Sequence, residues 1–384
     1  MPSLSFEPSE FATRRANVLA RMAERGLDGM LLFKQESRYY LTGYDSMAFM
    51  YFHCLYLGAD GAMTLLCRLP DMRHARFTSV IEDIRTWYDH PDTNPAGDMV
   101  AILKEHGKEG ARIGVEQSSY GCLAQIWIAL KTACANFCTL EDASDLVDGL
   151  RVVKSPAELD FVRHAAKLAD DALGEGNRLA VPGAFEGDIL AAMQGTIFSG
   201  GGTFPAAYWV IGSGPKAMLV RYHTGRRHLD PVDQLQLEFA GSYRRYHACL
   251  MRTILTGKAT DQQARMHEAC VEALTACQDV CRPGHTVGEV FDAHARVMDA
   301  HGMREHRLNA CGYSLGATYA PSWMDWPMFY TGNEIEIVPG MVFFMHMILA
   351  DSGRQLAMAL GETVITTDGP CERLSAQPWD LVVN

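Results

Sequence analysis

Residues 234–253 read QLQLEFAGSYRRYHACLMRT and have the pattern of two β-strands joined by a short turn. In the first half, apolar residues at odd positions alternate with residues of different character at even positions, which is the period of a strand with two unlike faces. Gly241 and Ser242 are expected to open the turn, and the second strand is expected over residues 246–254. The second half of the chain is therefore organised around a hairpin.

Glu238 lies among mostly apolar neighbours on the first strand of this hairpin. The second strand carries His247, Cys249 and Met251 on one side, because alternate residues of a strand share a face. A carboxylate in apolar surroundings is costly unless it is paired or used. Glu238 is thus the first candidate for a catalytic residue, and a half-exposed glutamate on the polar face of an ordinary strand is the alternative.

Length and composition are those of a globular protein large enough for two domains. The chain has 384 residues, of which 48% are hydrophobic and 21% are charged. A net charge of -12 does not favour binding to nucleic acid or anionic membranes, because both require basic patches. No uncharged apolar run reaches the roughly 18 residues of a transmembrane helix, and the first residues lack a signal-peptide core. The expected location is the cytoplasm.

The 11 cysteines are scattered along the chain, and none forms a C-x-x-C pair. Cys277 and Cys281 are four residues apart on one face of an expected helix, with no second pair at zinc-site spacing. This pattern predicts reduced, mostly buried thiols.

Residues 1–152 alternate between helix and strand patterns. A helix is expected over residues 9–25 with Gly26 as its stop, followed by a buried strand over residues 29–33. Later strands and helices give an α/β N-terminal domain. Residues 37–57 are unusually rich in Tyr and Phe, and form either a core strand pair or a surface that meets a partner or ligand.

A domain boundary is expected where the chain reads RVVKSPAEL, at residues 151–159. Ser155 is a good N-cap, Pro156 fits the first helical position, and Glu158 completes a capping box. Residues 153–384 then combine helices with largely antiparallel strands, which predicts an α+β domain. Gly200, Gly201 and Gly202 lack the spacing of a phosphate-binding loop.

Five further motifs resemble the pita-bread superfamily of creatinase, prolidase and methionine aminopeptidase. They are the RVVKSPAEL run, GSGP at 212–215, the R-T that ends the hairpin, GYSLG at 312–316 and PGMVF at 339–343. The resemblance covers nearly the whole chain, since creatinase and prolidase also carry an α/β N-terminal domain. It implies a creatinase-like domain over residues 1–152 and a pita-bread catalytic domain over residues 153–384.

The metal-binding members of that superfamily use two Asp, one His and two Glu as ligands. The resemblance places these positions on Glu238, Cys249, Tyr313, His346 and Gly361. Two divalent ions need several hard anionic ligands, and one carboxylate remains. The expectation is therefore no cofactor and no metal, as in creatinase. A single zinc on Glu238, Cys249 and His346 is the chemical alternative.

Within the superfamily the closer resemblance is to the ectoine hydrolases. It is carried by YYLTGYD at 39–45, VRYHTGRR at 220–227, LEFAGSYRRYHA at 237–248, ACGYSLGATYAP at 310–321, WMDWPM at 323–328 and FFMHMIL at 343–349. This resemblance implies hydrolytic opening of the cyclic amidine of ectoine to N-acetyl-2,4-diaminobutyrate, with hydroxyectoine as a second substrate. It also implies a cytoplasmic homodimer and a downstream deacetylase as a possible partner.

The resemblance suggests roles for the acidic and histidine side chains. Glu238 is expected to act as the nucleophile or as the general base. Proton transfer is expected from His346, His223 or His247, because imidazole titrates in the useful range. Glu362 is a weaker candidate, since its one-place offset from Gly361 turns it to the opposite strand face. A satisfied core or strand-face residue is the alternative for each histidine.

Substrate binding is assigned to a second set of residues. Arg221 suits the substrate carboxylate, because a guanidinium binds it bidentately, and it stands where creatinase has its proton-shuttling His. The other candidates are a hydrogen-bonding Tyr313, a trans-subunit group of Asp45, Phe49 and Tyr51, and Trp326 and Phe329 facing the amidinium. An ordinary ion pair for Arg221 and plain packing for the aromatic residues remain alternatives.

Three other functions compete with this interpretation. One is C–N hydrolysis of a creatine-like amidine, which the missing shuttle His at Arg221 disfavours. Another is a non-catalytic pita-bread module that binds peptides or proteins. The third is a metal dipeptidase, which the replaced ligands disfavour.

Overall fold

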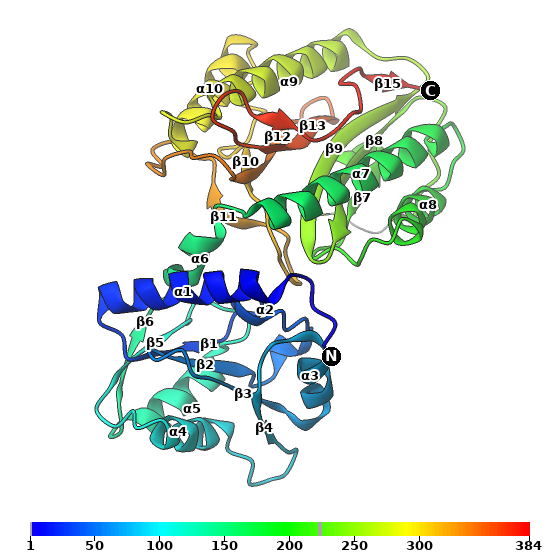
Figure 1. Ribbon diagram of the computed structural model, residues 1–384. Coiled ribbons are helices and arrows are strands. Elements are labelled where there is room, and N and C mark those ends of the chain that lie inside the picture. The colour runs from blue at the N-terminus through cyan, green and yellow to red at the C-terminus, as the bar shows by residue number, and fades with distance from the viewer. Residues whose placement is uncertain (1, 222–224) are drawn as a thin grey trace. The chain divides into compact units, whose positions relative to one another are not determined.

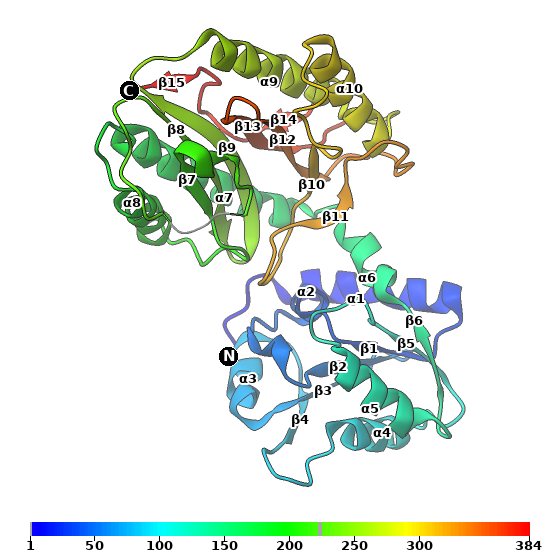
Figure 2. The same cartoon turned by 180° about the vertical axis from the view of Figure 1, so that it is seen from behind.

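The computed structural model describes residues 2–221 and 225–384. The chain divides into two compact units, Met1–Arg151 and Val152–Asn384, which Figures 1 and 2 show from opposite sides. The expected boundary after residue 152 lies beside this division. The first unit has the expected α/β architecture and the second has the expected α+β architecture.

The first unit is built on a six-stranded sheet in the order β4-β3-β2-β1-β5-β6. Strand β2 runs antiparallel to β1 and β3, whereas β1, β5 and β6 run parallel to one another. Helices α1 and α6 pack on one face of the sheet, and α4 and α5 pack on the other (Figure 1). The bounds are α1 Pro8–Arg25, β1 Gly29–Leu32, α2 Gln35–Thr42, β2 Cys54–Gly58, β3 Met63–Arg68, α3 Met72–Thr78, β4 Asp83–Trp87, α4 Pro95–Glu105, β5 Arg112–Val115, α5 Ala124–Cys134, β6 Thr139–Asp142 and α6 Ser144–Arg151.

Helix α1 follows the predicted pattern closely. Its buried Phe11, Val18 and Met22 recur at helical spacing, and Val18 and Met22 pack in the core on the sheet. The helix ends at Gly26, whose φ of 65° is the left-handed conformation that glycine adopts without strain.

The aromatic stretch of residues 37–57 is only partly a strand, so the expected strand pair is wrong. Its first half forms α2, and only its end forms β2. Tyr39, Tyr44 and Tyr56 are fully buried, which supports a core role for most of the stretch. Phe49 is half-buried and Tyr51 is exposed, so the end of the loop before β2 is the part available to a ligand or partner.

The second unit is built on a nine-stranded sheet whose main path is β11-β10-β12-β13-β9-β8-β7. Every pairing along this path is antiparallel. The strands are β7 Val210–Ser213, β8 Asp233–Tyr243, β9 Tyr246–Thr256, β10 Gly312–Ser314, β11 Asp325–Met328, β12 Val342–Asp351, β13 Leu356–Ile365, β14 Glu372–Arg373 and β15 Val382–Val383. The helices are α7 Pro156–Leu179, α8 Glu186–Ser199, α9 Asp261–Val280 and α10 Val287–Ala300.

Helix α7 begins as predicted. Ser155 and Glu158 form a reciprocal capping box, with Pro156 in the first turn. Such a box satisfies two backbone N–H groups that the first turn leaves without helical partners. The cap therefore determines where the chain leaves the first unit and enters the helix layer of the second.

The four helices of the second unit cover one face of its sheet. Leu237 on β8 lies against Gly176 of α7, and Leu360 on β13 belongs to the core beneath α9 and α10. Both residues are in register with Arg252 on β9, so all three share a face. The residues between them, including Glu238, point to the other face.

The central hairpin is present, but the predicted turn is wrong. Strand β8 continues to Tyr243, which pairs with Tyr246, and the turn residues are Arg244 and Arg245 with φ of 47° and 70°. Two consecutive positive φ values suit the twist of a two-residue hairpin. Gly241 instead allows α7 to approach β8 closely, because a Cβ there would lie 1.9 Å from the Ala165 carbonyl oxygen of α7.

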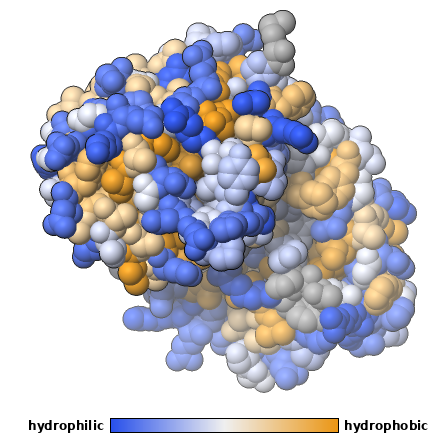
Figure 3. All heavy atoms as spheres, turned by 90° about the horizontal axis from the view of Figure 1, so that it is seen from below, coloured by the Kyte–Doolittle hydropathy of each residue, from blue (hydrophilic) through white to orange (hydrophobic). Residues whose placement is uncertain are grey.

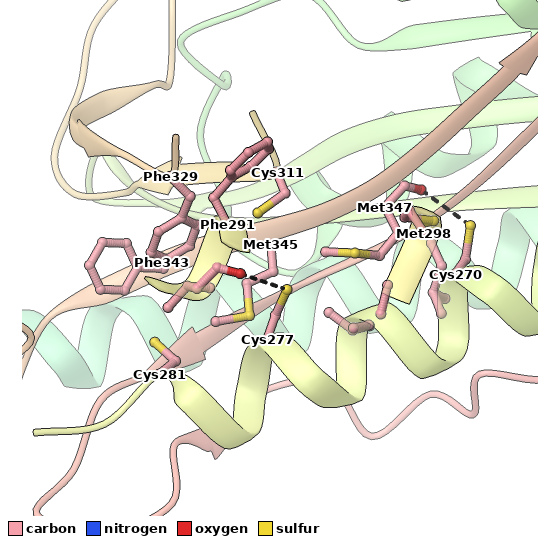
Figure 4. Close-up of a cluster of buried hydrophobic side chains, with 14 of the residues drawn as sticks. Cys270, Cys277, Cys281, Phe291, Met298, Cys311, Phe329, Phe343, Met345 and Met347 are labelled. Atoms are coloured by element: carbon pink, nitrogen blue, oxygen red, sulfur yellow. Dashed lines mark hydrogen bonds between the residues drawn. The ribbon is translucent and has the colours of Figure 1, made fainter. Parts of the chain in front are cut away.

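The core between α9, α10 and β12 is rich in sulfur (Figure 4). The Cys270 thiol donates to the Met347 carbonyl oxygen at 3.7 Å, and the Cys277 thiol donates to that of Val290 at 3.5 Å. Of the 11 cysteines, all but Cys138 and Cys371 are buried, and none is bridged to another. These thiols fill apolar space, as expected for reduced cysteines.

The surface is mixed in polarity. Figure 3 shows hydrophilic residues over much of one face, with apolar residues in smaller groups between them. In the described part of the chain, no helix combines the length and apolarity needed to span a bilayer.

Candidate active site

The open face of the second sheet brings the predicted residues together in two adjacent rows. Strand register places Glu238, Met251, Gly361 and His346 in one row across β8, β9, β13 and β12. The next row along the strands holds Cys249 on β9, Thr363 on β13, Phe344 on β12 and Tyr313 on β10. The five positions that hold metal ligands in the resembling enzymes are therefore neighbours on one face, opposite the helices.

The packing around Gly361 leaves little room for a larger side chain. A Cβ on Gly361 would meet two ring atoms of Phe344 at 3.0 Å and the Met345 carbonyl oxygen at 2.8 Å. Phe344 is fully buried, and its ring lies against those of Tyr313 and His346 at centroid distances of 5.6 and 5.5 Å. The space that a glutamate at position 361 would need is therefore occupied by an aromatic ring.

The donor set does not fit a pair of divalent metal ions. Glu238 is the only carboxylate at the five positions, and burial raises the pKa of the Cys249 thiol well above its usual range. A neutral thiol and a phenol are poor ligands for hard divalent ions, and one carboxylate with one imidazole is too few ligands for two metal ions. Among residues 2–221 and 225–384, no three His, Cys, Asp or Glu side chains converge as a metal site would require.

Glu238 is half-buried on the open face, and its carboxyl group is largely desolvated. Burial raises its pKa from 4.5 to about 7, while the charge of Arg221 and a hydrogen bond from Tyr313 act in the opposite direction. A carboxyl group that titrates near neutral pH can accept or release a proton during a reaction. Arg221 is exposed, yet its charge is close enough to Glu238 to be felt there.

A hydrogen-bond relay leads from Trp323 through Tyr313 to Glu238. The Trp323 Nε1–H donates to the Tyr313 hydroxyl at 2.8 Å, and that hydroxyl donates to Glu238 Oε1 at 3.4 Å. An indole N–H can only donate, so it occupies the phenol oxygen as acceptor and leaves the phenol proton to point elsewhere. Trp323 therefore sets the polarity of the relay, and Tyr313 is a donor toward Glu238.

Trp323 was not predicted as a site residue. It is buried, in the WMDWPM run that carried the family resemblance. That run gave no reason to prefer Trp323 over Trp326, because both are large aromatic residues in an irregular segment. The structure separates them: Trp326 is 48% exposed, and Trp323 is 4% exposed.

His346 lies beside this relay. Its ring is 5.6 Å from that of Tyr313, and burial lowers its pKa to about 4. The imidazole is therefore neutral at pH 7. Its buried Nδ1 has no hydrogen-bond partner within the described parts of the chain. A neutral, unengaged ring nitrogen is suited to taking up a proton during a reaction.

His247 is held differently. Its Nε2 accepts from the Ala206 N–H at 2.9 Å, so the ring proton is on Nδ1, which faces Thr318 Oγ1 at 3.2 Å and the Gly316 carbonyl oxygen at 3.4 Å. Burial lowers its pKa to about 4. The neutral ring ties β9 to two loops, and proton transfer by His247 would require one of these contacts to break.

Glu362 lies on the helix face of the sheet, as its one-place offset suggested. It is fully buried and accepts hydrogen bonds from Arg373, Gln278 and Trp379, with distances of 2.6 Å to Arg373 Nε, 3.0 Å to Gln278 Nε2 and 2.8 Å to Trp379 Nε1. Such a network satisfies a buried carboxylate. It also directs Glu362 away from Glu238.

The remaining predicted residues are spread over several places. Phe329 is fully buried and stacks on Phe343 within the core on the helix side, so its prediction as a substrate contact is wrong. Asp45, Phe49 and Tyr51 lie in the first unit, where Arg68 stacks on the Tyr51 ring at 4.6 Å. His223 lies outside the described residues.

Two family models match the chain. Residues 14–153 match the creatinase/prolidase N-terminal domain, and residues 160–368 match metallopeptidase family M24.

Individual relatives are similar over their whole lengths. An ectoine hydrolase of Halomonas elongata is 27% identical over 99% of both chains. A probable dipeptidase, PepE, of Mycobacterium tuberculosis is 26% identical over 100% of this chain and 99% of its own. Among solved structures, dipeptidase PepE from Mycobacterium ulcerans superposes with a TM-score of 0.86 and 24% identity, covering 98% of this chain and 99% of that one. The last similarity shows a shared fold.

Proposed function

This chain belongs to metallopeptidase family M24 and carries a creatinase/prolidase N-terminal domain, and we propose that it hydrolyses the cyclic amidine ring of ectoine without a metal ion. The observation that carries the proposal is Glu238, the one carboxylate at the five positions, with a pKa of about 7 and a hydrogen bond from Tyr313, whose ring lies against that of His346. Similarity to an ectoine hydrolase along the whole chain supports the choice of substrate.

The charge of the proposed substrate suits this face. Ectoine is a six-membered cyclic amidine that carries a carboxylate, and its protonated amidine has an electrophilic carbon between the two nitrogens. An ionised Glu238 attracts this cation, and the cation in turn lowers the pKa of Glu238 and favours the carboxylate form. Binding of the substrate would therefore favour the ionised Glu238, which either attacks the amidine carbon or removes a proton from the attacking water.

The chemistry needs one new C–O bond and one broken C–N bond. Glu238 either attacks the amidine carbon directly, giving an ester that water then hydrolyses, or removes a proton from an attacking water. In both routes one ring nitrogen leaves with a proton, and the open product is N-acetyl-2,4-diaminobutyrate. Tyr313 holds Glu238 Oε1 by donating to it, so Oε2 is the oxygen left for the reaction.

His346 is the preferred proton carrier. It is neutral at pH 7, has an unengaged Nδ1 and contacts the Tyr313 ring. In the general-base route it would accept the proton from Glu238 and deliver it to the leaving nitrogen. His247 is the less favoured candidate because its ring nitrogens are engaged, and His223 remains a prediction from the sequence.

Arg221 is proposed to bind the substrate carboxylate. It is exposed at the open face and lies near enough to Glu238 for its charge to affect that residue. A guanidinium pairs with a carboxylate through two parallel hydrogen bonds. Trp326, which is 48% exposed, is proposed to contribute a cation–π contact to the amidinium.

The proposed assembly is a cytoplasmic homodimer. Asp45, Phe49 and Tyr51 would then line the pocket of the partner subunit, which suits the exposure of Tyr51. Hydroxyectoine is a second proposed substrate, and a deacetylase that consumes the product is a possible partner.

A metal dipeptidase is the main rival, because dipeptidase relatives also match the full chain. Proton NMR of chelator-treated protein with ectoine tests the proposal, and hydrolysis of a dipeptide by metal-supplemented protein tests the rival. Loss of the amidine proton signal with gain of an acetyl resonance supports the proposal, and the spectrum identifies the acetylated nitrogen. If ectoine stays intact both with chelator and with added Mn, Co or Zn, the proposal fails, and the metal dipeptidase, a creatine-like substrate or a binding module becomes the favoured function.

A variant tests the role of Glu238 separately. Glu238→Gln keeps the shape of the side chain and removes the charge, so turnover of ectoine should be almost completely lost. Retention of more than about 10% of the wild-type rate would exclude Glu238 as nucleophile or base.

A further inference from the structure

The first unit contains an arginine that is buried without a visible partner. Arg38 on α2 is 0% exposed, and its Nε and both terminal nitrogens have no hydrogen-bond partner among the residues that the structure describes. Arginine stays charged in proteins and offers five N–H donors. An unpaired charge in the interior is strongly unfavourable, so native proteins pair it.

The buried carboxylate of Glu116 does not fill this need. Glu116 accepts hydrogen bonds from the Lys34 N–H at 2.8 Å and from the Ser37 hydroxyl at 2.5 Å. Its charge acts on Arg38 from a distance and opposes the lowering of the Arg38 pKa by burial. Burial also raises the pKa of Glu116 to about 7, so at neutral pH its negative charge is incomplete.

Other polar groups around Arg38 are also left without partners. Arg38 lies 6.0 Å from the centroid of the Tyr44 ring, which stacks on the ring of His53 at 6.5 Å. His53 is 1% exposed, and its Nδ1 has no partner within the described chain, while its Nε2 lies 3.3 Å from Asp71. Gln35 has its amide nitrogen bonded to the Tyr44 carbonyl oxygen at 2.6 Å, and its Oε1 is buried without a donor.

This cluster lies where α/β sheets commonly hold ligands. Helix α2 begins directly after β1, and Glu116 directly follows β5, which runs parallel to β1. His53 precedes β2, the other neighbour of β1. The crevice outside the carboxyl ends of parallel strands is the usual binding place in such sheets. Arg38 is thus an unpaired cation at a position suited to a ligand.

We propose that Arg38 binds a small buried anion in the first unit. This anion site is distinct from the proposed hydrolytic site of the second unit. The guanidinium can only donate hydrogen bonds, so its partner must be an acceptor, and a negative charge would offset the buried cation. Because Arg38 is fully covered, the anion must be small, such as a halide or a short carboxylate. A halide and a short carboxylate are both compact monoanions that can accept several N–H hydrogen bonds.

Anion-dependent unfolding tests this site. Protein dialysed into chloride-free gluconate buffer is titrated with bromide, chloride or formate at constant ionic strength, and its unfolding midpoint is measured. A ligand that binds only the folded state raises the midpoint until the site is saturated. The wild type should show a saturable upward shift that Arg38→Met abolishes. A shift with formate alone identifies a carboxylate site, and a shift with halides identifies a halide site.

Arg14→Met is the matched control. Arg14 is also buried, at 2% exposure, but it is bonded to Glu10 and to the Tyr40 carbonyl oxygen. This variant should lose stability and keep the anion dependence. Equal anion dependence in the wild type and Arg38→Met would overturn the proposal. If Arg38→Met does not fold, crystals of the wild type in bromide decide: an anomalous peak within hydrogen-bonding distance of Arg38 supports the site, and a peak height of zero there refutes it.

Discussion

Glu238→Gln should change how stability depends on pH, with a size set by the burial of this carboxyl group. Burial raises the pKa of Glu238 from 4.5 to about 7, so the folded state binds its proton more tightly than the unfolded state does. A group of this kind favours the fold below pH 4.5, and its contribution is lost as pH rises through about 7. The difference in pKa corresponds to about 3 kcal/mol. Glutamine does not titrate, so the free energy of unfolding of the variant does not decrease with pH for this reason.

The assay is urea unfolding of both proteins between pH 4 and pH 9. The free energy of unfolding of Glu238→Gln, minus that of the wild type, should rise by about 3 kcal/mol from pH 4 to pH 8. Glu116, whose pKa is also raised to about 7, is present in both proteins and cancels in the difference. A difference that stays constant with pH would show that the Glu238 carboxyl is well solvated, and the reasoning about its reactivity would then be refuted.

Three further variants examine the packing and polarity of the second unit. Trp323→Phe removes the donor that orients Tyr313, so the acidic limb of the pH–rate profile should shift upward and the rate should fall about 5- to 10-fold. Trp209→Phe is its control, because that buried indole N–H has no partner in the described chain, and an equal shift there would contradict the relay. Gly361→Ala should cost about 1–3 kcal/mol in urea unfolding through its contact with Phe344, and Phe344→Leu in the same chain should recover part of that loss. Gly241→Ala should cost about 3 kcal/mol or more by forcing α7 away from β8, and a loss below 1 kcal/mol in urea unfolding would mean that the helix shifts easily.

Local signals in the sequence were enough to predict most elements of the fold. The stop at Gly26 and the capping box at Ser155 are satisfied by neighbours within a few residues, so their patterns are readable without knowledge of the rest of the chain. The alternation around Glu238 likewise predicted the face to which it points. Gly241 failed as a turn signal because its cause is the approach of α7, which is distant in sequence.

The site itself was only partly predictable for the same reason. The family resemblance placed Glu238, Tyr313 and His346 at one site, but it did not predict the hydrogen bond from Trp323. Phe329 was misplaced because a substrate-facing aromatic residue and a core aromatic residue look alike when only their type is known. The orientation of a side chain in an irregular segment depends on tertiary packing that no local pattern contains.

The packing around the five positions where the resemblance places metal ligands would prevent single substitutions from building a two-metal site. Cys249→Asp would place a second carboxylate near Glu238, but Gly361 still has no room for a glutamate while Phe344 fills that space. Tyr313 in turn packs on Phe344 and takes its hydrogen bond from Trp323. Restoring a ligand at one position therefore requires the aromatic residues at several others to move. Tyr313, which packs on Phe344, also donates a hydrogen bond to Glu238, so the packing that fills the space beside Gly361 and the environment of Glu238 share a residue.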